Sequence, residues 1–144
     1  MISDSQLFVI GIDASNLKQG GGLTHLVELL AALVLKQHNF SKIIIWSNEK
    51  VFLEIDDYSW LKKLSPVALN CGLLKQFFWR KYNLSSAAKE EGCDLLFIPG
   101  GSYNYSFNPV VVMSRNMLPF KWNELLRYKF SWATIRLILL RWIQ

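Results

Sequence analysis

Apolar residues along the chain gather in short β-rich runs separated by longer helix-like stretches. The runs are rich in Val, Ile and Phe and lack strict alternation, which is typical of strands buried on both faces of a parallel sheet. Among them, "PVALN" carries the weakest strand signal. The predicted strands cover 7–14, 42–47, 66–70, 93–101 and 109–114.

The stretches between these runs have helical length and strong helix formers. Segment 23–37 is apolar almost all round, which suits a helix enclosed in a core. Segment 73–92 is predicted to break near Asn83 and to end at Gly92. A short helix is expected at 49–54, and "KWNELLRYK" and "SWATIRLILLRWIQ" are helical patterns. Strands alternating with helices predict an α/β, Rossmann-like domain, in which helices flank a parallel sheet.

In such a sheet, ligands bind beyond the carboxyl ends of the strands, where the strand order reverses. The usual order, 3-2-1-4-5, makes strands one and four neighbours. Loops 13–22 and 99–106 would then flank one crevice, and loop 114–120 could reach it. The candidate crevice residues are Asp13, Thr24, His25, Gly100, Gly101, Ser102, Tyr103, Arg115 and Asn116.

Three consecutive glycines, Gly20, Gly21 and Gly22, precede the first long helical pattern. The N–H groups and the dipole of a helix N-terminus favour anions, and the missing Cβ lets a phosphate approach closely. The spacing matches neither the dinucleotide fingerprint nor the P-loop. A flexible start of the helix explains the glycines equally well, so the pattern leaves both interpretations open.

The other candidates also allow two interpretations each. Asp13 either accepts hydrogen bonds from a ligand or caps the turn after strand one. His25 either contacts a sugar or phosphate or is a structural histidine. Arg115 offers a fork of donors for phosphate, and Asn116 can both donate and accept, as sugar hydroxyls require. A turn asparagine beside a solvated arginine is the alternative, and the position of the pair favours the site.

The net charge of +5 lies entirely in the last thirty residues, which hold six basic residues and one acid. On a helical wheel of 131–144, Trp and Ile share one face and arginines lie off it. This pattern suits an anionic membrane surface, and a core-facing helix with a basic rim is the alternative. The candidate membrane residues are Lys121, Trp122, Arg127, Lys129, Trp132, Arg136, Arg141 and Trp142.

Several function classes find no support in the sequence. Cys71 and Cys93 form no metal or redox motif and indicate a reducing compartment. No nucleophile–base triad, metal cluster or nucleic-acid motif is visible, so no metal or cofactor is expected. No signal peptide and no apolar run of spanning length is recognised. We expect a cytoplasmic protein, peripheral on the inner face of the plasma membrane if its basic end binds lipid.

Three segments carry a resemblance to a known family: "IGIDASNLKQGGGLTHLVELLAAL", "CDLLFIPGG" and "VVVMSRNMLPF" followed by "RYKFSWATIRLILLRWIQ". In order and spacing they resemble the N-terminal domain of GT-B-fold glycosyltransferases of the family 4 type, which build bacterial envelope and polysaccharide glycans. The resemblance implies that Gly20, Gly21 and Gly22 face the phosphates of a nucleotide-sugar donor. It places Arg115, Asn116 and the 100–103 loop on the side of a glycan or lipid-linked acceptor.

The resemblance also implies that this sequence contains only one of the two domains of such an enzyme. In that family most donor contacts, including a paired-glutamate motif, belong to a C-terminal domain that this sequence lacks. Many relatives have a histidine where this chain has Arg115-Asn116, so no catalytic residue is assigned. We expect 1–120 to form the N-terminal domain and 121–144 a basic amphipathic segment of an incomplete chain, inactive by itself. The alternatives are a non-catalytic Rossmann-like module that docks on a membrane or partner protein, and a small-molecule enzyme on a flavodoxin-like fold.

Overall fold

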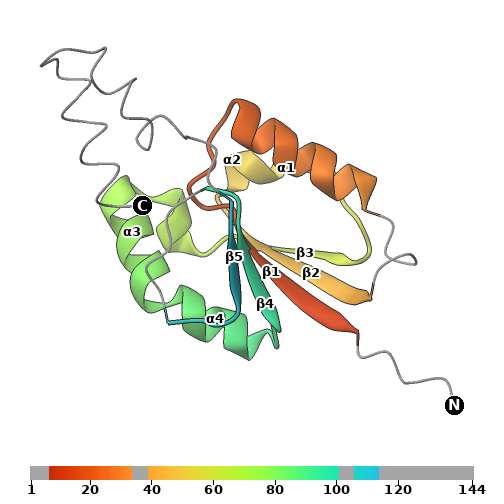
Figure 1. The fold of residues 1–144 in the computed structure, drawn as a ribbon. Helices are drawn as coiled ribbons and strands as arrows, with labels where there is room; N and C mark the ends of the chain where they lie inside the picture. Colours follow the sequence, from red (N-terminus) through yellow and green to blue (C-terminus); the bar gives the residue numbers. More distant parts are fainter. Residues whose placement is uncertain (1–6, 34–38, 101–105, 114–144) are drawn as a thin grey trace, which may run out of the picture.

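The computed structural model describes residues 7–33, 39–100 and 106–113. Its centre is a sheet of five strands, all parallel, in the order β3-β2-β1-β4-β5 (Figure 1). Both the α/β, Rossmann-like class and the strand order expected from the sequence are confirmed. The strands are β1 (Phe8–Asp13), β2 (Phe40–Trp46), β3 (Leu61–Leu64), β4 (Leu95–Ile98) and β5 (Val110–Val112).

Helices cover both faces of the sheet (Figure 1). One face packs against α1 and α2, and the other against α3, α4 and a short 3₁₀ helix, η2. These elements are α1 (Gly21–Ala32), α2 (Glu49–Phe52), η2 (Val67–Asn70), α3 (Leu73–Tyr82) and α4 (Leu84–Glu90). The break expected near Asn83 is confirmed, since α3 ends and α4 begins there.

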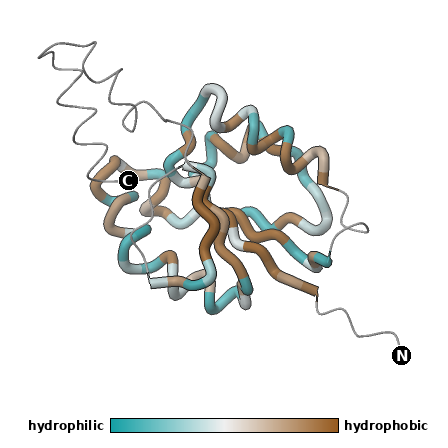
Figure 2. The backbone as a smooth tube through the Cα atoms, in the orientation of Figure 1, coloured by the Kyte–Doolittle hydropathy of each residue, from teal (hydrophilic) through white to brown (hydrophobic). Residues whose placement is uncertain are grey.

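Successive side chains of β2 pack into two separate hydrophobic cores, one on each face of the sheet. Ile43 and Ile45 point to the cluster under α1, whereas Ile44 and Trp46 point to the cluster under α4. All four are almost completely buried. Covering both faces is what makes the strand continuously apolar in sequence, and Figure 2 shows the central strands in brown.

The middle of β1 requires a residue without a side chain. A Cβ on Gly11 would lie 2.9 Å from the Trp46 ring, 3.0 Å from Leu96 Cδ1 and 3.1 Å from Cys93 Sγ. The large side chains of the two neighbouring strands therefore meet directly across β1. Gly11 is a packing requirement of the sheet.

The third strand is not where the sequence pattern predicted it. The prediction of a strand at 66–70 is wrong, because 67–70 forms η2 and the strand is Leu61–Leu64. This strand reads "LKKL" and lies at the sheet edge, where its lysines are held by Glu91 and Asp57. Pro66 has no N–H to give to a ladder, so the chain turns into η2 after the strand.

The first helix starts earlier than predicted. The expectation was 23–37, but α1 begins at Gly21, so two of the three glycines lie inside it. Its described part ends at Ala32, and 34–38 lie outside the described residues. The helices and the basic segment predicted within 121–144 also lie outside them.

Candidate functional site

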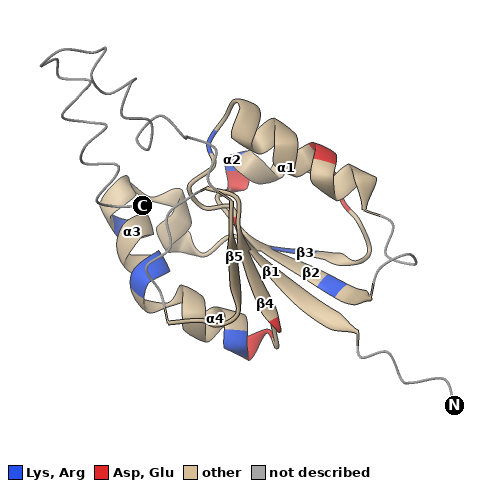
Figure 3. Ribbon diagram, viewed as in Figure 1, with Lys and Arg blue, Asp and Glu red and all other residues tan. Residues whose placement is uncertain are grey.

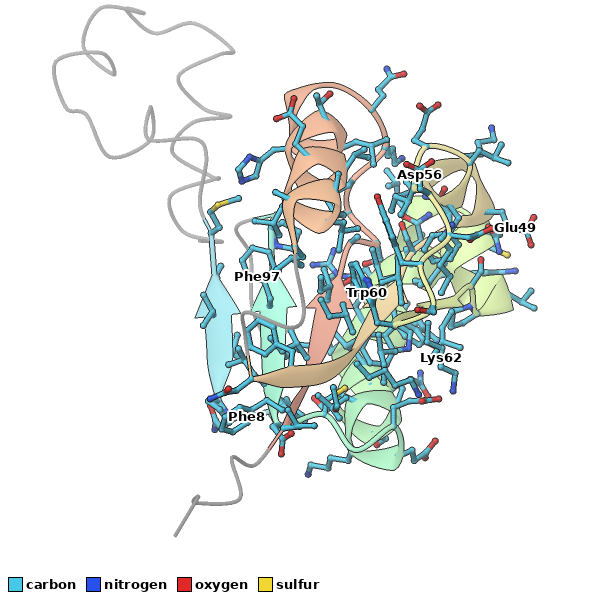
Figure 4. The ribbon with its side chains drawn as sticks, turned by 90° about the vertical axis from the view of Figure 1, so that its right-hand side faces the viewer. Phe8, Glu49, Asp56, Trp60, Lys62 and Phe97 are labelled. Atoms are coloured by element: carbon cyan, nitrogen blue, oxygen red, sulfur yellow. The ribbon has the colours of Figure 1, made fainter. Side chains whose placement is uncertain are left out.

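The carboxyl ends of β1, β2 and β3 meet at one edge of the sheet, where the loops 14–20 and 47–48 and η2 gather (Figure 1). Figure 4 shows Glu49, the first residue of α2, toward this edge and Phe8 at the opposite end of the strands. Ser47 ties two of the loops together, since its Oγ donates to the Ala14 carbonyl at 3.0 Å. Loops tied in this way can hold a ligand site in a fixed shape.

Asp13 ends β1 and is fully buried. Its Oδ1 accepts hydrogen bonds from the Ser15 backbone N–H (3.1 Å) and the Ser15 hydroxyl (2.5 Å). Its Oδ2 lies 3.3 Å from Arg80 Nε of α3. Of the two roles considered for Asp13, the structure gives it the turn cap, and its carboxylate also ties α3 to the sheet.

The loops after β1 and β4 are in contact, as expected of neighbouring strands. Gly100 lies so close to Asn16 that a Cβ at position 100 would overlap the Asn16 amide. Asn16 Oδ1 is buried and has no hydrogen-bond partner among the described residues. The predicted crevice between these loops is therefore filled at this point by Asn16.

Open space lies farther along the same edge, toward β2 and β3. One cavity of about 390 Å³ is lined by the β1–α1 loop, α2, η2 and α3. A second, of about 610 Å³, lies between the start of α1 and α2. Both are lined by Lys18, Gln19 and Lys50. The remaining lining residues are Asn48, Leu69, Asn70 and Gln76 in the smaller cavity, and Gly20, Leu23, Thr24, Val27, Glu28 and Glu54 in the larger.

Gly20 stands where the larger cavity meets the N-terminus of α1. Its φ of 81° and ψ of −166° belong to a region that only glycine occupies readily, and no atom lies within 4 Å of a Cβ placed there. No side chain caps the helix at Gly20. The glycine thus gives the helix its entry angle and leaves the surface beside it open.

Of the other residues predicted for the site, Thr24 and His25 are exposed on the first turns of α1. Thr24 lines the larger cavity, and its Oγ1 donates to the Gly20 carbonyl at 3.4 Å. The remaining predicted site residues, both acceptor-side and membrane-side, lie outside the described residues. They are Gly101, Ser102, Tyr103, Arg115, Asn116, Lys121, Trp122, Arg127, Lys129, Trp132, Arg136, Arg141 and Trp142.

Three residues that the sequence pattern did not single out also line the cavities. Lys18 and Lys50 are exposed cations shared by both cavities, and Gln76 reaches the smaller one from α3. Lys18 lies in the loop that the sequence already marked, directly before the glycines. For Gln76 no local signal exists, since only the fold brings α3 to this edge.

No family model, curated protein or solved structure matches the chain. Within the described part of the chain, no group of His, Cys, Asp and Glu could hold a metal ion. No described helix has the length and apolar character needed to cross a bilayer.

Proposed function

We propose that this domain holds the diphosphate of a nucleotide-sugar and is the N-terminal domain of a glycosyltransferase that acts on a polysaccharide or lipid-linked acceptor. One observation carries the proposal: Lys18 and Lys50 line two adjoining cavities at the carboxyl edge of the sheet, and Gly20 lines the larger one. A helix N-terminus and two cations together favour a phosphate group. The resemblance noted above supports the same ligand.

The cavities have the size and chemistry that such a donor needs. Volumes of about 390 and 610 Å³ fall within the range of small-molecule sites, roughly 300–1,000 Å³. Lys18 and Lys50 would neutralise the diphosphate. Glu28 and Glu54 in the larger cavity, and Asn48 in the smaller, would accept hydrogen bonds from sugar or ribose hydroxyls.

In sugar transfer, the bond from the anomeric carbon to the diphosphate oxygen breaks and the acceptor hydroxyl oxygen takes its place. The hydroxyl proton passes to a base, which we do not assign. The part we assign to this chain is to bind the diphosphate and stabilise the charge that develops on it. In this proposal the other wall of the crevice belongs to a second domain, so we expect binding without turnover from the 144 residues alone.

Isothermal titration calorimetry with nucleoside diphosphates, their sugar conjugates and inorganic pyrophosphate tests the proposal. We expect at least one nucleotide to bind, and the K18Q/K50Q variant to weaken that binding by at least about tenfold. K42Q/K89Q is the matched control, because Lys42 lies near the start of β2 and Lys89 in the last turn of α4, away from the cavities.

Two results would contradict the proposal. If no nucleotide and no pyrophosphate bound, the non-catalytic binding module would be the better description. If K18Q/K50Q and K42Q/K89Q weakened binding equally, the attraction would be general and would not involve these cavities.

A further inference from the structure

Helix α3 turns two polar side chains and a tryptophan toward the protein, and its other large apolar side chains toward solvent. Its inward side chains, Gln76, Trp79 and Arg80, lie at positions i, i+3 and i+4 of one helix face. Gln76 Nε2 donates to the Leu69 and Cys71 carbonyls at 2.8 and 3.0 Å. Trp79 packs against the core under α4, and Arg80 pairs with Asp13. These three side chains fix which face of α3 points outward.

The outward face is apolar and aromatic. None of the ten residues of α3 is fully buried. Five of its large apolar side chains are at least half exposed: Leu73 (67%), Leu74 (76%), Phe77 (51%), Phe78 (53%) and Tyr82 (63%). Single exposed apolar residues are ordinary, but a contiguous group on one helix marks a contact surface.

The aromatic rings on this face pack against one another. Phe78 stacks on Tyr82, with ring centroids 6.2 Å apart and planes at 7°. Phe77 meets Phe78 edge to face at 5.8 Å. Lys81 Nζ lies 5.4 Å from the centre of the Tyr82 ring. The rings therefore form a continuous layer at the surface, not a set of side chains reaching for the core.

The charge on this helix has one sign. The sequence of α3, "LLKQFFWRKY", contains two lysines and an arginine but no Asp or Glu. Lys75 and Lys81 are exposed, and Figure 3 shows blue without red along α3. Long lysine side chains can lie along an apolar surface and place their ammonium groups at a lipid headgroup. Aromatic rings flanked by lysines suit the boundary between headgroups and acyl chains.

We propose that the outward face of α3, formed by Leu73, Leu74, Lys75, Phe77, Phe78, Lys81 and Tyr82, docks on a bilayer with anionic headgroups. The one-signed charge complements such a surface, and the apolar side chains enter the upper acyl region. The proposal does not depend on the glycosyltransferase assignment. It is also separate from the basic segment 121–144, because it rests on α3 alone.

Co-sedimentation of the 144-residue chain with vesicles tests this. Vesicles of phosphatidylcholine mixed with phosphatidylglycerol should bind the chain, and salt or pure phosphatidylcholine should weaken binding. L74S/F78S should weaken it by at least about tenfold, because two inserted side chains are lost. The matched control is L53S, since Leu53 is 86% exposed but lies at the end of α2. K75Q/K81Q, which alters only exposed charges, should also weaken binding by at least about tenfold.

Three results would overturn the proposal. The first is absence of vesicle binding at low salt. The second is binding that the α3 variants leave unchanged while R136Q/R141Q abolishes it, which would assign the contact to the basic segment. The third is a dimer in sedimentation velocity that L74S/F78S converts to monomer without any vesicle binding, which would make a second copy the occupant. K75Q/K81Q keeps the test valid should L74S/F78S fail to fold.

Discussion

Helices α1 and α3 begin alike but attach to the sheet by different means. Each follows a glycine, Gly20 or Gly72, and neither has a side-chain cap. Helix α1 buries Leu23, Leu26 and Leu30, whereas α3 buries no residue completely. It is held instead by one tryptophan, a glutamine bound to two carbonyls and a buried ion pair. The difference teaches that the number of apolar residues in a helix does not decide which of its faces packs against the sheet.

The largest effect should come from cutting the ion pair that holds α3. In the R80A variant, the fully buried Asp13 carboxylate loses its cation, which should lower the unfolding free energy by about 3–5 kcal/mol. Urea denaturation measures this, and hydrogen exchange should speed up in α3 before α1. The control K75A should stay within about 0.5 kcal/mol. If R80A increased the hydrogen-exchange rates of α1 and α3 equally, the ion pair would not be what attaches α3 to the sheet.

The next prediction compares one apolar side chain from each helix. Leu26 of α1 is 1% exposed, and L26A should cost about 2–5 kcal/mol through lost burial and a cavity. Phe78 of α3 is larger but 53% exposed, and F78A should change stability by at most about 0.5 kcal/mol. Urea unfolding of both variants checks this. A cost for F78A close to that of L26A would mean that the outward face of α3 is packed in solution.

The start of α1 offers a matched pair of glycines. A Cβ meets no atom within 4 Å at either Gly20 or Gly21, but only Gly20 has a positive φ. G20A should therefore destabilise by about 1–3 kcal/mol, whereas G21A should stabilise by about 0.4–1 kcal/mol by restricting the unfolded chain. Thermal unfolding distinguishes the two signs. The same sign in both variants would show that backbone strain does not define this helix start.

The last prediction concerns Cys93, whose effect on stability is confined to alkaline pH and which lies on the sheet face that α3 and α4 cover. Burial, aided by the charges of Glu91 and Asp94, raises the pKa of its thiol from 9.0 to about 11, although Lys42 opposes this. The folded protein keeps this proton at a pH where the unfolded chain has lost it. Stability from this group is therefore complete below pH 9 and falls as the pH rises toward 11.

Comparing the wild type with C93A in urea across that alkaline range measures the Cys93 contribution. The unfolding free energy of the wild type minus that of C93A should be constant below pH 9 and should decrease above it, because only the wild type carries the thiol. A difference that stays constant through pH 11 would mean that Cys93 titrates as it does in the unfolded chain.

The sheet could be predicted from sequence because its central strands are apolar on both sides. Strand β2, "FSKIIIW", has that character, and so does β1. Edge strand β3 reads "LKKL". Its two lysines pair with Glu91 and Asp57, which are distant or outside the strand, so no local pattern in the sequence predicts these ion pairs. Local hydrophobicity therefore predicts the apolar strands of this sheet, including β5 at the other edge, but not a strand such as β3 whose lysines are held by ion pairs.

The candidate site was predictable only in its location. The rule for parallel sheets points to the carboxyl edge, and Lys18 and Gly20 lie in the loop it selects. Gln76 and Arg80 come from a helix distant in sequence, and nothing in "LLKQFFWRKY" says that these two and Trp79 face inward. Their orientation follows from partners on β1 and η2, which only the folded chain brings near.

The contact across Gly11 has a consequence for how this sequence can vary. The Trp46 ring, Leu96 and Cys93 all lie about 3 Å from where a Cβ at position 11 would be. A larger residue at position 11 could be accepted only if position 46 became smaller. Among diverging homologues, these two positions should therefore change together, and a chain with Ala at 11 should carry a side chain smaller than tryptophan at 46.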